Sequence, residues 1–83
     1  MRTRDEALRI YNSLYTLLDC TNPPEDLARA LGFHSRTHSG VYVKLCLDRQ
    51  GTYYFYFELS IPCDLSAEVG IYADDTIFDK YLT

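Results

Sequence analysis

The sequence lacks the features that most quickly reveal a biochemical function. It contains no apolar run long enough to cross a bilayer, and its charged N-terminus lacks the apolar centre of a signal peptide. No internal repeat or low-complexity tract interrupts it. From these absences and a length of 83 residues, we expect one soluble cytoplasmic domain spanning 1–83, with no membrane partner.

Disulfide and metal signatures are also missing. The three cysteines, Cys20, Cys46 and Cys63, are odd in number, widely spaced and never arranged as C-x-x-C, so we expect reduced and mostly buried thiols. His34 and His38 are four residues apart, a spacing that aims both side chains at one metal when they lie on a helix. They fall instead in an expected loop with no third ligand nearby in sequence, so we expect no metal site and no cofactor.

Catalytic arrangements are equally hard to find. None of the cysteines is flanked by a glycine-rich turn or by the sharp elbow that exposes a nucleophile. The adjacent carboxylates Asp74 and Asp75 fit a helix cap and a solvated surface better than an acid and base pair. We therefore expect a protein that is not an enzyme.

Apolar residues make up 47% of the chain, a value typical of globular domains, and their spacing predicts helices first. Residues 3–19 have the periodicity of a helix lying on a core. Thr3 and Glu6 at its start form the pattern of a capping box. A second helix is expected from Asn22, a good cap, to Gly32, a good stop, followed by a polar loop over 33–40.

The clearest element is a β-hairpin over 41–61. Apolar and polar residues alternate on both sides of the segment 48–51, where Gly51 favours a three-residue turn with a bulge. This turn places Asp48 opposite Thr52. The pairs that follow from that register are Tyr42–Glu58, Val43–Phe57, Lys44–Tyr56, Leu45–Phe55 and Cys46–Tyr54.

Weaker alternation over 67–73 predicts a third strand with Val69 and Ile71 inward, and the apolar spacing over 75–82 predicts a short closing helix. Asp74 or Asp75 would cap this helix. The predicted fold class is α+β, in the order ααβββα. Two N-terminal helices pack on a small antiparallel sheet, and a short C-terminal helix closes the chain.

Tyrosines dominate one face of the expected hairpin. Tyr42, Tyr54 and Tyr56 share that face, and Tyr72 joins them if the third strand forms. Tyrosine combines a large apolar ring with a polar tip, which suits protein interfaces. Two alternatives stay open: a helix covers this face, or the face is exposed and binds a partner or a second copy of the chain.

Charge is unevenly distributed. Residues 1–57 carry a net charge of +1 and residues 58–83 a net charge of −5, within a total of −4. Phosphate backbones repel acidic proteins, so we expect no direct nucleic-acid contact and favour a protein partner with a basic surface. The alternative is a small winged-helix-like DNA-binding regulator, in which residues 27–37 begin a helix-turn-helix and Arg29, Arg36 and Lys44 form a basic face.

The overall profile, short, acidic, α+β and free of motifs, is similar to that of small phage or mobile-element proteins that inhibit host machines, anti-CRISPR proteins among them. No single residue carries this similarity. It implies a non-catalytic inhibitor that occupies a basic, nucleic-acid-binding groove of its target, with carboxylates standing in for phosphates. The expected partner-binding residues are Tyr42, Tyr54, Tyr56, Asp64, Glu68, Tyr72, Asp74, Asp75 and Asp79.

Overall fold

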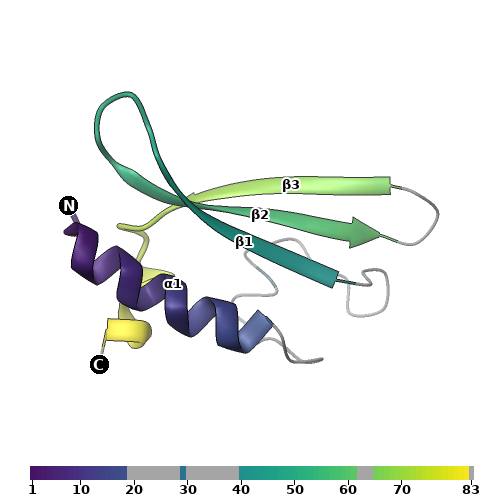
Figure 1. Cartoon of the computed structure of the whole chain (residues 1–83), viewed down its shortest axis with the longest axis horizontal. Coiled ribbons are helices and arrows are strands. Elements are labelled where there is room, and N and C mark those ends of the chain that lie inside the picture. The colour runs from purple at the N-terminus through teal and green to yellow at the C-terminus, as the bar shows by residue number, and fades with distance from the viewer. Residues whose placement is uncertain (19–28, 30–39, 62–64, 83) are drawn as a thin grey trace.

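In the part of the chain that the structure describes, a 15-residue helix and a 3-10 helix lie on the same side of a three-stranded antiparallel sheet (Figure 1). This computed structural model describes residues 1–18, 29, 40–61 and 65–82. The elements in chain order are α1 (Arg4–Leu18), β1 (Gly40–Leu47), β2 (Tyr53–Ile61), β3 (Leu65–Tyr72) and η1 (Thr76–Leu82). The α+β class is confirmed, whereas the second predicted helix lies outside the described residues except for Arg29, which is helical.

Helix α1 begins where the sequence predicted a capping box. The Glu6 amide donates to Thr3 Oγ1 over 3.2 Å, and the Thr3 amide donates to Glu6 Oε1 over 3.0 Å. These reciprocal bonds satisfy two amides that a helix start otherwise leaves unpaired. The bond with the Thr3 amide lowers the pKa of Glu6. Ala7, Ile10 and Leu14 are buried on the side of the helix that faces the sheet.

The hairpin has the predicted register. Tyr42 pairs with Glu58, Val43 with Phe57, and the remaining pairs follow without a slip from Gly40 opposite Ser60 to Leu47 opposite Tyr53. Gly51 has a φ of 82°, the left-handed conformation that the bulge requires. The Asp48 amide donates to the Thr52 carbonyl over 3.0 Å and closes the turn.

Strand β3 confirms the third strand with shifted bounds. It pairs antiparallel with β2 from Leu65 opposite Ile61 to Tyr72 opposite Tyr54, so β2 is the central strand. The predicted range of 67–73 began two residues late and ended one residue late. Ala73 nevertheless stays attached, since its amide donates to the Tyr53 carbonyl over 3.0 Å.

The closing helix is a 3-10 helix, η1, held by one buried ring. Asp75 Oδ1 accepts from the Ile77 amide over 3.1 Å, which confirms the predicted cap. Phe78 is fully buried and packs edge-to-face on Phe55, with ring centroids 4.8 Å apart. The core joins these rings to Ile10, Leu14, Val43, Phe57 and Ala73.

Arg2 links the N-terminal part of the chain to its C-terminal part by hydrogen bonds and an ion pair. Its guanidinium donates to the Ala73 carbonyl and to the Asp79 carboxylate, and its amide donates to Asp74 Oδ1 over 2.7 Å. Figure 1 shows the two termini on the same side of the molecule, in agreement with these bonds. The Arg2 side chain is only 13% exposed, so it is a structural cation and not a solvated one.

Candidate functional site

The face of the sheet turned away from α1 and η1 is the outer face. It is formed by residues 42, 44 and 46 of β1, residues 54, 56 and 58 of β2, and residues 68, 70 and 72 of β3. The buried core lies entirely on the opposite face, where α1 and η1 pack. Among residues 1–18, 40–61 and 65–82, no element covers the outer face, so the alternative in which either terminal helix lies over it is wrong.

The outer face brings all four predicted tyrosines together from three strands. Tyr42 is 64% exposed and Tyr72 is 54% exposed, while Tyr54 and Tyr56 in the centre are half-buried. The rings of Tyr54 and Tyr72 meet edge-to-face with centroids 6.0 Å apart. Such a contact orients both rings and leaves their remaining surface open.

Carboxylates dominate the charge at the end of this face that lies away from the hairpin turn. Glu58 and Glu68 lie directly opposite each other on β2 and β3, an unfavourable arrangement for like charges. Lys44 Nζ lies 3.6 Å from Glu58 and balances one of them. A hydrogen bond to Glu68, with partial burial, raises the pKa of Tyr56 to about 12. Two acids therefore share one lysine and one hydroxyl donor.

Asp48 marks the end of the outer face next to the hairpin turn. Its Oδ1 accepts from the amides of Gln50, at 2.9 Å, and Thr52, at 2.8 Å. Its Oδ2 accepts from the Tyr72 hydroxyl over 3.3 Å. The bond from the Thr52 amide is the main cause that lowers the pKa of Asp48, so this carboxylate stays charged at neutral pH.

A pocket of about 350 Å³ opens between Asp48, Tyr54, Gly70 and Tyr72. Both tyrosines were predicted from the sequence as binding residues, whereas Asp48 and Gly70 were not. Asp48 was visible as the turn residue opposite Thr52. Its approach to Tyr72 depends on the pairing of β2 with β3, which the sequence did not specify.

Cys46 lies beside this pocket and is the one described thiol. It is half-buried and reduced. Its electrostatic effect on Tyr54, with partial burial and a hydrogen bond between the two side chains, raises the pKa of the Tyr54 hydroxyl. Cys20 and Cys63 lie outside the described residues.

The predicted acidic residues do not form one surface. Glu68 is exposed on the outer face, and Asp64 lies outside the described residues. Asp74 and Asp79 bind Arg2, and Asp75 caps η1, so these three acids lie past the end of β3 and already have partners within the chain.

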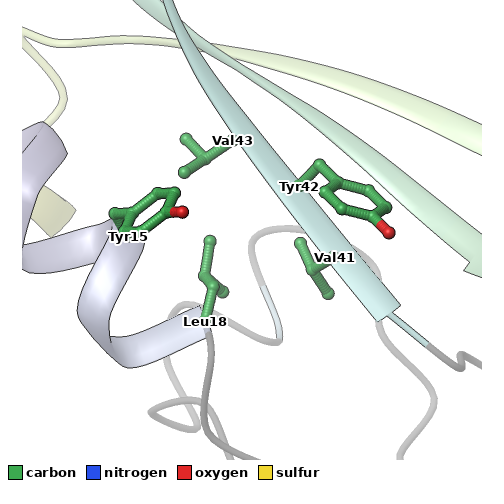
Figure 2. A pocket seen from close by; sticks show the side chains of 5 residues that line it. All are labelled: Tyr15, Leu18, Val41, Tyr42 and Val43. Atoms are coloured by element: carbon green, nitrogen blue, oxygen red, sulfur yellow. The ribbon is translucent and has the colours of Figure 1, made fainter.

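A second hollow, of about 130 Å³, lies at the edge of β1 (Figure 2). Val41 and Val43 of β1, with Tyr15 and Leu18 at the end of α1, form its apolar part, and Tyr42 lies on the other side of the strand. Leu18 and Gly40 border the segment 19–39, whose arrangement is described only at Arg29. This hollow therefore carries no functional argument.

The remaining hypotheses from the sequence concern a metal site, a membrane span and DNA binding. His34, His38 and Arg36 lie outside the described residues. Within the part of the chain that the structure describes, no three potential ligands cluster as a metal site, and no helix has the length and apolar character to cross a bilayer. Lys44, assigned to a DNA-binding face in the winged-helix alternative, is paired with Glu58.

Comparison with known proteins adds no relative. No family model matches the chain, and neither the curated proteins nor the solved structures give a match.

Proposed function

We propose that this chain is a non-catalytic protein-binding module whose outer face docks on a basic surface of its partner. The observation that carries the proposal is the group of four tyrosines, two exposed and two half-buried, on a sheet whose opposite face holds the whole described core. Tyrosine is enriched among the residues that dominate binding energy, because its ring buries a large area and loses little side-chain entropy.

The negative charge of the outer face and of the whole chain favours a basic partner. Glu58 and Glu68 lie on the outer face, where the described strands carry one cation, Lys44, and Asp48 lies at the end of this face next to the turn. The whole chain carries a net charge of −4. A basic partner would be attracted at long range, and the association rate would fall as salt screens that attraction.

The most concrete form of the proposal is an inhibitor of a nucleic-acid machine, such as a CRISPR effector, whose basic groove the outer face would occupy. Of the described acids predicted to bind the partner, Glu68 is the one on the outer face, where it accepts a hydrogen bond from Tyr56. Asp74, Asp75 and Asp79 contribute to the negative field near the end of β3, although Arg2 neutralises part of it.

The test is capture of a CRISPR effector from lysate by three tagged proteins: the wild type, a Tyr42→Thr/Tyr72→Thr variant and a Tyr15→Gln control. Threonine keeps a high strand propensity, and Tyr15 has the same 64% exposure as Tyr42 but lies on α1. We expect a salt-sensitive complex with the wild type and the control, and at least a tenfold loss with the outer-face variant.

Retention of the complex by the outer-face variant would show that another surface binds. A gel shift with random duplex DNA at low salt tests the winged-helix alternative separately, because a DNA-binding protein keeps non-specific affinity there. Binding of duplex without an effector complex would move the assignment to a regulator.

A further inference from the structure

Gly70 occupies a position in β3 where the fold does not need glycine. It lies in the strand interior opposite Tyr56, and its φ is outside the left-handed region that favours glycine. A Cβ at this position would meet only Tyr54 Cδ2, at an ordinary contact distance of 3.8 Å. Glycine weakens a strand interior, and where neither turn nor crowding explains it, close approach of a ligand or another chain is the common reason.

The groups around Gly70 define what could approach. The pocket has the Tyr54 and Tyr72 rings and the Asp48 carboxylate around a floor without a side chain. Aromatic faces attract cations, and a neighbouring carboxylate strengthens that attraction. Lys44, the cation on the strands of this face, is engaged with Glu58 in the neighbouring part of the sheet and does not line the pocket.

The hydrogen-bonding capacity left in the pocket favours a planar, forked donor. Both lone pairs of Asp48 Oδ1 are used by backbone amides, whereas Oδ2 accepts one bond and can accept another. The Tyr72 hydroxyl oxygen also keeps acceptor capacity and lies 3.3 Å from Oδ2. Two acceptors side by side suit two N–H groups of a guanidinium, which also stacks on aromatic rings better than an ammonium does.

We propose that the pocket formed by Asp48, Tyr54, Gly70 and Tyr72 receives an arginine side chain of the protein partner. The inference rests on the proposed function, since it names the contact by which the outer face recognises a basic surface. The arginine stem would lie over Gly70, with its guanidinium against the rings and between the two acceptors.

The test uses three capped tripeptides, Gly-Arg-Gly, Gly-Lys-Gly and Gly-citrulline-Gly, titrated into isotopically labelled protein and followed by amide chemical shifts. Citrulline keeps the planar shape and loses the charge. We expect the arginine peptide to shift the amides of Thr52, Gly70 and Tyr72, the lysine peptide to bind more weakly, and citrulline at least about tenfold more weakly.

Two variants locate the binding. Gly70→Val fills the floor of the pocket and suits a strand, so we expect a folded protein without the arginine-dependent shifts. Tyr72→Phe keeps the ring but removes one acceptor, and we expect roughly threefold to tenfold weaker binding. Amide chemical shifts that match those of the wild type elsewhere in the sheet would show that each variant is folded.

Equal binding of citrulline, unchanged binding to Gly70→Val, or shifts confined to another surface would each overturn the assignment. So would an absence of shifts with all three peptides at millimolar concentration. Capture of the effector by Gly70→Val with wild-type affinity would show that the partner does not use the arginine pocket, while the proposed function would still stand. Loss of effector capture by the Tyr42→Thr/Tyr72→Thr variant, with capture kept by Gly70→Val, would lead to the same conclusion.

Discussion

Replacing Gly70 and Gly51 with alanine should have opposite effects on stability. At Gly70 an added Cβ meets one ring carbon at 3.8 Å and the backbone is compatible with any residue. Alanine there should stabilise the folded state by about 0.5–1 kcal/mol, because it restricts the unfolded chain more than glycine does. At Gly51 the φ of 82° places alanine in the left-handed region, which costs about 1–2 kcal/mol.

The difference between the two variants is therefore about 1.5–3 kcal/mol. For a domain of this size each kcal/mol shifts the melting temperature by about 4–8 °C, so the melting curves should separate by more than about 6 °C. Urea unfolding monitored by circular dichroism gives the same comparison at 25 °C. Destabilisation by Gly70→Ala equal to that of Gly51→Ala would refute the claim that the fold does not need glycine at position 70, and with it the first step of the arginine-pocket argument.

Three further perturbations test other parts of the structure. Arg2→Ala should lower the free energy of unfolding by about 1–2 kcal/mol, measured by urea unfolding, because Asp79 and the C-terminal turn lose their cation. Phe78→Ala should cost about 3–5 kcal/mol, since the ring is fully buried against the core, and wild-type stability in calorimetry would contradict the position of η1. The raised pKa of Tyr56, about 12, means that its bond to Glu68 stabilises the folded state fully below pH 10 and loses that effect as the pH rises toward 12. Absorbance at 295 nm should show late-titrating tyrosines, because the pKa of Tyr54 is also raised, and Glu68→Gln should bring the Tyr56 step near pH 12 down toward pH 10; an unchanged step near pH 12 would disprove the contact.

The hairpin was predictable in detail because two local signals agreed. Alternation decides which side chains face inward, and the turn with Gly51 decides which residues lie opposite each other, so a slip of one residue would expose Val43 and Phe57. The capping box at Thr3 and the cap at Asp75 are equally local, since each involves atoms within three residues.

Local sequence patterns could not predict the pocket or the contacts of Arg2 near the C-terminus. Asp48 and Tyr72 are 24 residues apart and Arg2 and Asp79 are 77 apart, so both contacts depend on the packing of the whole sheet. The bounds of β3 also came from pairing, because its start is set by Leu65 opposite Ile61 and not by its own weak alternation. Arg2 pairs with two of the C-terminal acids, Asp74 and Asp79, whereas the sequence showed these acids only as part of a negatively charged segment.

The residues of the outer face are easier to explain by binding than by folding. A small domain with one described helix and one 3-10 helix covers one face of its sheet, and the other face could be filled with threonine, lysine and glutamine at little cost. This chain instead places four tyrosines there, sets Glu58 opposite Glu68 and leaves Gly70 without a side chain. The opposed acids and the strand glycine each weaken the isolated fold, and a basic partner surface docked on this face would bring cations to the acids and a side chain over the glycine. In the proposed complex, an arginine over Gly70 would explain the tyrosines and the glycine, and other basic residues of the same partner would face Glu58 and Glu68.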